Sequence, residues 1–166
     1  MKLVVAIRYI DALFFTKKNI KDMGLKTYIA LGHPAVSKNH TIISFTREGG
    51  FPIRGLLIPN ETLVLEKQKI LKKLDIPKSQ SRGGCDTGVF WKDMVYFENG
   101  KIPNQFAQMY TEGKFFSQTS DAIVIKNPET IEIKKGNIDN YPKVKTTFFI
   151  IPRALITGIE LYGKKI

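Results

Sequence analysis

Short apolar runs that are rich in β-branched and aromatic residues recur along this chain, and turn signals separate them. Such runs are typical of β-strands. The clearest of them are residues 3–9, 25–31, 41–47, 89–97, 144–152 and 154–162. An Asn99–Gly100 pair follows one of these runs closely and is a strong signal for a tight turn. The pattern predicts a protein dominated by antiparallel β-strands.

Three segments depart from this pattern and favour helices. Residues 11–23 carry a loose apolar stripe and end at a glycine. Residues 61–74 follow a potential cap at Asn60 and place four apolar side chains on one face. Residues 104–113 are compatible with a third, short helix. The expected fold class is therefore α+β, as a single domain over residues 1–166, dominated by antiparallel β-strands with two helices in the N-terminal half.

The chain has one cysteine, Cys85, and two histidines, His33 and His40. One cysteine cannot form an intrachain disulfide, and these three residues fall short of the four ligands of a structural zinc site. A reducing compartment suits such a chain. No apolar stretch approaches the roughly 18 residues that a membrane helix needs. We therefore expect a cytoplasmic protein that does not interact with a membrane.

The formal net charge is +11 and the pI is near 9.7. Lysine supplies most of the basic residues. Lysine attracts phosphates diffusely, whereas arginine favours bidentate contacts with bases and phosphates. The composition thus indicates non-specific affinity for polyanions, with DNA or RNA as the expected partner. A chain that uses lysine mainly for solubility would have a similar composition.

A basic run extends over the helix expected at residues 61–74 and the polar, Gly-rich segment that follows it. Its candidate nucleic-acid-binding residues are Lys69, Lys72, Lys73, Lys78 and Arg82. Aromatic residues, including Phe90 and Trp91, come shortly afterwards. Basic and aromatic side chains together are typical of grooves that bind single-stranded nucleic acid. The aromatic residues have an alternative role in the core, where β proteins usually place them.

Residues 120–134 hold the pattern that points most directly to catalysis. With a turn at residues 126–129, Asp121 would lie opposite Lys134 and share one face of a hairpin with Glu132. Two carboxylates so placed can bind Mg²⁺, and a neighbouring ammonium can stabilise charge on a phosphate. Asp121 and Glu132 are therefore the candidate metal ligands, and Lys134 completes the candidate catalytic group.

This segment resembles the catalytic hairpin of the PD-(D/E)XK nuclease family, in which an acidic residue, a hairpin and an acid–x–Lys triplet follow one another. The resemblance covers about 15 residues. It implies a Mg²⁺-dependent nuclease with Asp121, Glu132 and Lys134 at its centre. Ser120 stands where the family has proline, and the rest of the chain lacks the helix that the family core adds. An amphipathic strand pair with a solvated face would carry the same residues.

Two shorter motifs lie in the Gly-rich segment. Asp86–Thr87–Gly88 matches the active-site triplet of aspartic proteases, but a loop turn is the preferred interpretation because no apolar strand precedes it. Cys85 lies in the segment expected to be an exposed loop, where it could act as a nucleophile. The alternative is a thiol that takes no part in the function.

Three functions remain open at this point. The leading one is a basic intracellular nucleic-acid-binding or -processing protein. The second is a Mg²⁺-dependent nuclease, the only one of the three that requires a cofactor. The third is a protein-interaction module, for example a viral or accessory factor with incidental charge, which would expose an apolar patch and form a homo-oligomer. The sequence leaves open whether the protein is an enzyme.

Overall fold

The computed structural model describes residues 4–16, 23–64, 86–134, 137–140 and 147–161. Regular structure in these ranges consists of β-strands and two short 3-10 helices, and no helix there reaches seven residues. The protein is therefore all-β, and the expected α+β class is wrong. No helix in the described ranges is long and apolar enough to cross a membrane.

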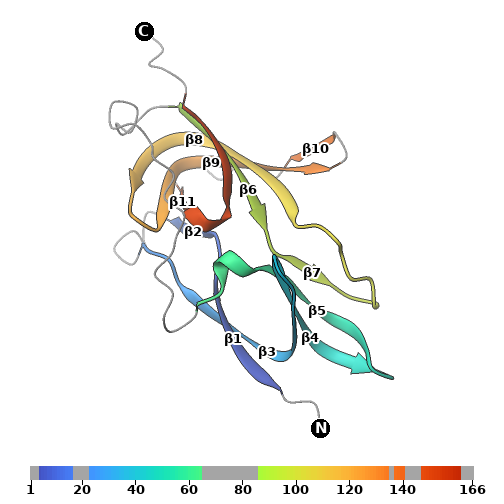
Figure 1. Ribbon diagram of the computed structural model, residues 1–166. Coiled ribbons are helices and arrows are strands. Elements are labelled where there is room, and N and C mark those ends of the chain that lie inside the picture. The colour runs from blue at the N-terminus through green and yellow to red at the C-terminus, as the bar shows by residue number, and fades with distance from the viewer. Residues whose placement is uncertain (1–3, 17–22, 65–85, 135–136, 141–146, 162–166) are drawn as a thin grey trace.

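The strands form two antiparallel sheets (Figure 1). Sheet 1 has the order β1-β3-β4-β5-β7, and its strands are β1 (Val5–Ile10), β3 (Thr27–Val36), β4 (His40–Glu48), β5 (Phe51–Pro59) and β7 (Val95–Phe97). Sheet 2 has the order β12-β6-β8-β9-β11-β2, with β10 paired to β9. Its strands are β2 (Leu13–Thr16), β6 (Asp86–Asp93), β8 (Ala107–Gln118), β9 (Ala122–Lys134), β10 (Asn137–Asn140), β11 (Thr147–Pro152) and β12 (Ile156–Leu161). The 3-10 helices are η2 (Asn60–Thr62) and η3 (Arg153–Leu155).

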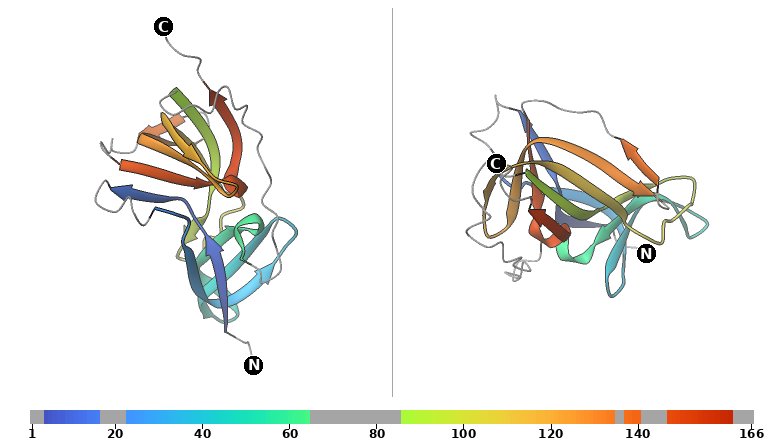
Figure 2. Two further views of the ribbon diagram at one scale, coloured as in Figure 1. Left: turned by 90° about the vertical axis from the view of Figure 1, so that its left-hand side faces the viewer. Right: turned by 90° about the horizontal axis from the view of Figure 1, so that it is seen from above.

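Two of the connections between the sheets are only one or two residues long. β1 of sheet 1 leads into β2 of sheet 2 through Asp11 and Ala12, and β6 of sheet 2 leads into β7 of sheet 1 through Met94. The left view of Figure 2 shows sheet 2 above sheet 1, with the β1–β2 crossover between them. A longer connection, residues 98–106, leads from β7 of sheet 1 to β8 of sheet 2.

The largest apolar core lies on one face of sheet 2. Its buried residues are Val89, Trp91, Met109, Phe115, Ile123, Ile125, Phe149, Ile151, Leu155 and Ile156. A smaller cluster covers the opposite face of the same strands and consists of Phe15, Ala122, Val124, Phe148 and Ile150. Because strand side chains alternate between faces, β11 and the first part of β9 are buried on both sides. A third cluster, of Ala30, Ile43 and Ile58, lies within sheet 1.

The three expected helices are wrong wherever the structure describes them. Leu13–Thr16 form β2, which pairs with β11, and Ala107–Gln118 form β8. The helix expected after Asn60 ends as one 3-10 turn, because Leu63 is already extended and bridges to Tyr9 of β1. β2 buries Phe15 and leaves Phe14 exposed, and β8 alternates between more and less buried residues. Pairing with neighbouring strands therefore overrides the local preference for a helix.

β9 continues without reversing through residues 126–129, where a hairpin turn was expected. Asn127 has a φ of 52°, and the pairing of β8 with β9 shifts register between Glu112 and Lys114. These residues therefore form a bulge, which bends a strand without reversing it. Opposite the bulge, a Cβ on Gly113 would lie 2.5 Å from Ile125 Cγ2, so the close approach requires glycine. The turn expected at residues 126–129 is wrong, and β8 reverses into β9 at residues 119–121 instead.

Candidate functional site

The structure does not bring the three candidate catalytic residues together. Asp121 lies in the turn before β9, whereas Glu132 and Lys134 lie near the far end of that strand. About 40 Å of extended strand therefore separates Asp121 from Lys134. Only Glu132 and Lys134 meet, in an ion pair of 3.3 Å. One Mg²⁺ ion cannot contact both proposed carboxylates, so the hairpin geometry behind the nuclease hypothesis is absent.

The structure describes only some of the other residues singled out in the sequence. Lys69, Lys72, Lys73, Lys78 and Arg82 lie outside the described residues, as does Cys85. Asp86, Thr87 and Gly88 begin β6 and pair with β8, so the loop turn expected there is wrong. Within the described ranges, no three His, Cys, Asp or Glu side chains are grouped so as to hold a metal ion.

The positive charge is unevenly distributed along the chain. The described residues contain one more acidic side chain than basic ones, although the whole chain carries +11. The excess of positive charge therefore belongs to the segments outside the described ranges. Residues next to four of these segments are Thr16, Asp86, Thr147 and Leu161.

These four residues lie at or within one residue of a row across sheet 2 that runs through Asp86, Lys114, Lys126, Phe148 and Phe15. Thr16 of β2 pairs with Thr147 of β11, and Leu161 of β12 pairs with Thr87 of β6. Between β6 and β11 the row crosses Lys114 of β8 and Lys126 of β9, which lie opposite each other. Six neighbouring strands span about 24 Å.

Exposed lysines and an exposed aromatic ring lie on one face of this row, and we call them the lysine row: Lys26, Lys114, Phe116 and Lys126. Lys126 lies opposite Phe148, whose ring centroid is 4.7 Å from that of Phe116. Phe148 lies opposite Phe15, and Lys26 Nζ is 5.6 Å from the centre of the Phe15 ring. Because paired residues project from the same side of a sheet, these side chains share one face.

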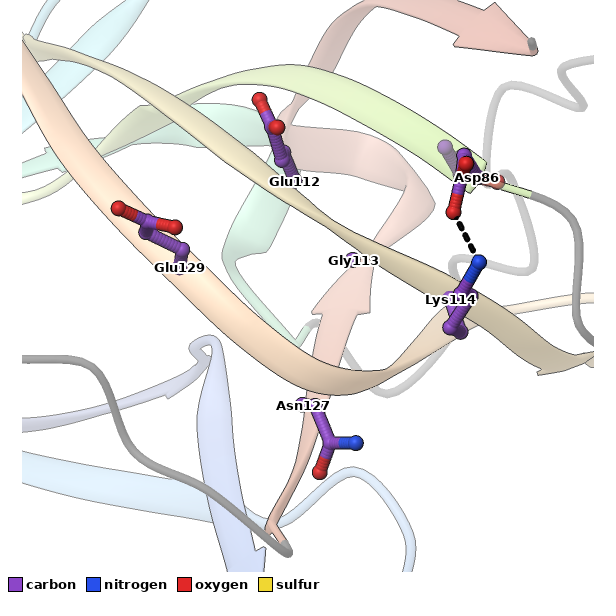
Figure 3. A pocket seen from close by; sticks show the side chains of 7 residues that line it. Asp86, Glu112, Gly113, Lys114, Asn127 and Glu129 are labelled. Carbon is purple, nitrogen blue, oxygen red and sulfur yellow. Dashed lines mark hydrogen bonds and ion pairs between the residues drawn. The ribbon is translucent and has the colours of Figure 1, made fainter.

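A pocket of about 450 Å³ borders the lysine row (Figure 3). Its lining consists of Asp86, Thr87, Glu112, Gly113, Lys114, Asn127 and Glu129. Lys114 turns toward Asp86 and forms an ion pair with it, while Glu112 lies directly opposite Glu129 on the neighbouring strand. Negative charge therefore dominates the pocket, and positive charge dominates the row on its β9 side.

A second group of titratable side chains lies where the chain crosses between the sheets. Asp11 and Asp93 flank the two crossovers, and their carboxyl groups are within hydrogen-bonding reach of each other. Burial, the charge of Asp11, the hydrogen bond to Asp11 and the charge of Glu132 together raise the pKa of Asp93 to about 8, against the lowering effect of the Met94 N–H. Burial also raises the pKa of Asp11, although the Ala12 N–H donates to its Oδ1 at 2.8 Å.

Sequence reasoning missed this carboxyl pair. Asp11 has the position of a helix cap and Asp93 that of an ordinary polar strand residue, and no motif links two acids so far apart in the chain. The chain matches no known family model, and no curated protein or solved structure is detectably similar to it.

Proposed function

We propose that this protein binds polyanions, with DNA or RNA as the partner class, and that the lysine row is part of the binding surface. The observation that carries the proposal is the position of Lys114 and Lys126, two exposed lysines that lie opposite each other on neighbouring strands of sheet 2. Lys114 also lies opposite Asp86, which directly follows the basic segment of residues 65–85. Neutralising phosphates releases condensed counterions, and this release drives binding of basic proteins to nucleic acid.

The exposed ring of Phe116 favours single strands among the possible polyanions. Its side chain is 40% exposed and lies on the same face as Lys126. Unpaired bases stack on exposed aromatic rings, whereas bases in a duplex are already stacked. The described face alone is only weakly basic, because Asp86 partly neutralises Lys114. The lysines outside the described ranges must therefore supply part of the affinity.

Binding of a labelled, mixed-sequence single-stranded oligonucleotide, measured by fluorescence anisotropy across a salt series, tests the function. We expect binding at about 50 mM salt and a steep loss of affinity as salt rises. The paired change Lys114→Gln and Lys126→Gln should lower the slope of log affinity against log salt by about one per lost phosphate contact. Absence of binding at low salt would contradict the proposed function.

Lys38 and Lys101 provide the matched control. Both are exposed and outside the lysine row: Lys38 lies between β3 and β4, and Lys101 lies in the connection that follows β7. Lys38→Gln and Lys101→Gln remove the same charge, so they should leave affinity and salt slope close to those of the unchanged protein. Equal losses in the two double variants would mean that the charge acts diffusely and that the lysine row is not a binding surface.

We propose protein interaction as a second candidate function, because sheet 1 exposes apolar side chains on one face of two adjacent strands. Val4, Ile29 and Leu31 are 61%, 59% and 63% exposed, and Leu31 lies opposite Ala6. Contiguous exposed apolar residues are typical of interaction surfaces. Sedimentation velocity of the unchanged protein and of Ile29→Lys with Leu31→Lys tests this role. A monomer in both cases would argue against self-association through this face.

A further inference from the structure

The two direct connections between the sheets meet at a pair of acidic side chains. Asp11 begins the step from β1 to β2, and Asp93 ends β6 just before the step to β7. Ala12, next to Asp11, packs against the main core of sheet 2, and Met94, next to Asp93, packs against the core of sheet 1. The two carboxyl groups are therefore each next to a residue that packs against one of the two cores.

The groups that face this pair are acidic or neutral. Burial, and after it the charge of Asp11, raises the pKa of the phenols of Tyr9 on β1 and Tyr28 on β3. Glu132 on β9 acts on Asp93 with a like charge. The cation next to Asp93 in the sequence, Lys92, instead pairs with Glu61 at 3.0 Å.

One carboxyl oxygen of Asp93, Oδ1, is buried and accepts no hydrogen bond from the described residues. A buried carboxylate without donors is costly, whereas a protonated carboxyl group is neutral and can donate to a neighbouring carboxylate. Two carboxylates at one buried site cannot both be charged without strong repulsion.

We propose that Asp11 and Asp93 form a proton-dependent clasp between the two sheets. With one proton shared between them, a carboxyl–carboxylate hydrogen bond holds the two crossovers together. Loss of that proton leaves two negative charges side by side, close to a third on Glu132, and loosens the junction.

The direction of the pH effect follows from where the proton is held. In the unfolded chain an Asp carboxyl group titrates near pH 4, whereas burial and Asp11 raise the pKa of Asp93 in the folded protein to about 8. Between these values the unfolded state has already lost a proton that the folded state retains. The free energy of unfolding therefore contains a contribution that is complete below about pH 4 and declines until about pH 8.

Trp91 provides a reporter at the junction. It is the single tryptophan of the chain, it is 3% exposed, and it lies two residues before Asp93 on β6. The fluorescence of the full-length protein should change between pH 5 and pH 10 with a midpoint near pH 8. Urea unfolding should require less denaturant at pH 9 than at pH 5.

Asp93→Asn tests the clasp directly, because its amide can donate to Asp11 but does not titrate. This variant should lose the fluorescence transition near pH 8 and most of the difference in urea midpoint between pH 5 and pH 9. Asp121→Asn makes the same chemical change in an exposed turn and should keep both. Asp11→Asn, which removes the acceptor charge, should move the transition to lower pH and provides a second variant if Asp93→Asn does not fold.

A transition that persists unchanged in Asp93→Asn, or in Asp11→Asn, would overturn the clasp. So would an unchanged protein whose urea midpoint does not fall between pH 5 and pH 9. Loss of the transition in Asp121→Asn as well would show that it reports a general change of charge and not this pair.

Discussion

The indole nitrogen of Trp91 donates a hydrogen bond of 2.9 Å to the hydroxyl oxygen of Thr111. Thr111 Oγ1 lies in turn 2.8 Å from Thr130 Oγ1. This chain of polar groups crosses β6, β8 and β9, and Thr111 is completely buried. A buried donor that loses its partner has no water to replace it, so the network fixes the register of the three strands more strictly than apolar packing would.

Thr111→Val keeps the shape of the side chain but removes the acceptor of the Trp91 N–H. We expect the free energy of unfolding to fall by about 1–3 kcal/mol, because the buried indole N–H is left without a partner. Urea unfolding followed by circular dichroism measures the change independently of tryptophan fluorescence. Thr27→Val, on an exposed position of β3, is the matched control and should change stability by no more than about 0.5 kcal/mol. Similar values for both variants would contradict this role of the network.

Gly55 on β5 marks the closest backbone approach in sheet 1. A Cβ at this position would lie 2.0 Å from the Ile43 carbonyl oxygen and 2.8 Å from Phe97 Cζ. The carbonyl belongs to the neighbouring strand and cannot rotate away, so Gly55→Ala should destabilise the protein by about 3 kcal/mol or more.

Gly24→Ala provides the comparison for Gly55→Ala. A Cβ at Gly24 would have nothing within 4 Å, so its effect on thermal unfolding should be small. A Gly55→Ala protein as stable as Gly24→Ala would show that β4 and β5 can move apart.

The turn signals of the sequence were recognised correctly at one site and misinterpreted at another. Asn99 and Gly100 have φ values of 58° and 71°, which confirms the tight turn expected after residues 89–97. Asn127 also has positive φ, but there the chain forms a bulge in a long strand and does not turn back. Asn and Gly residues indicate where the backbone can adopt a positive φ. Whether the strand ends at such a residue depends on its pairing, here that of β9 with β8 and β11.

The helix predictions failed for a related reason. The stripe in residues 11–23 includes Leu13, whose partner Ile150 on β11 lies far away in the sequence. The stripe predicts that these side chains are buried but not by which element. Strand predictions succeeded where β-branched runs are longest, as in β11, because few other structures bury every residue of such a run.

The candidate sites also depend on long-range contacts that the local sequence does not specify. The spacing of Asp121, Glu132 and Lys134 depended on one assumed turn, and moving that turn to residues 119–121 separated them. The Asp11–Asp93 pair leaves no local signal at all, because it depends on two crossovers that meet only in the folded protein. The net charge, in contrast, is a property of composition and needs no fold to be recognised.

Glu132 and Lys134 provide a graded test of the clasp. Burial and Asp11 raise the pKa of Asp93 most, and the charge of Glu132 adds to the rise. Lys134 Nζ lies 3.3 Å from a Glu132 carboxylate oxygen. Removing the negative charge with Glu132→Gln makes the surroundings of Asp93 less negative, so its proton leaves at lower pH. Removing the positive charge with Lys134→Met has the opposite effect, and the proton is held to higher pH.

The two variants should therefore move the midpoint of the Trp91 fluorescence transition in opposite directions. Each shift should be a fraction of a pH unit, because the Lys134 side chain is 61% exposed and solvent screens its charge. The pH range over which stability declines should end earlier in Glu132→Gln and extend further in Lys134→Met. Lys38→Met, an exposed lysine in sheet 1, should leave the midpoint unchanged. Shifts in the same direction would mean that these charges act on the whole fold, whereas opposite shifts require a titrating group beside Glu132, where Asp93 lies.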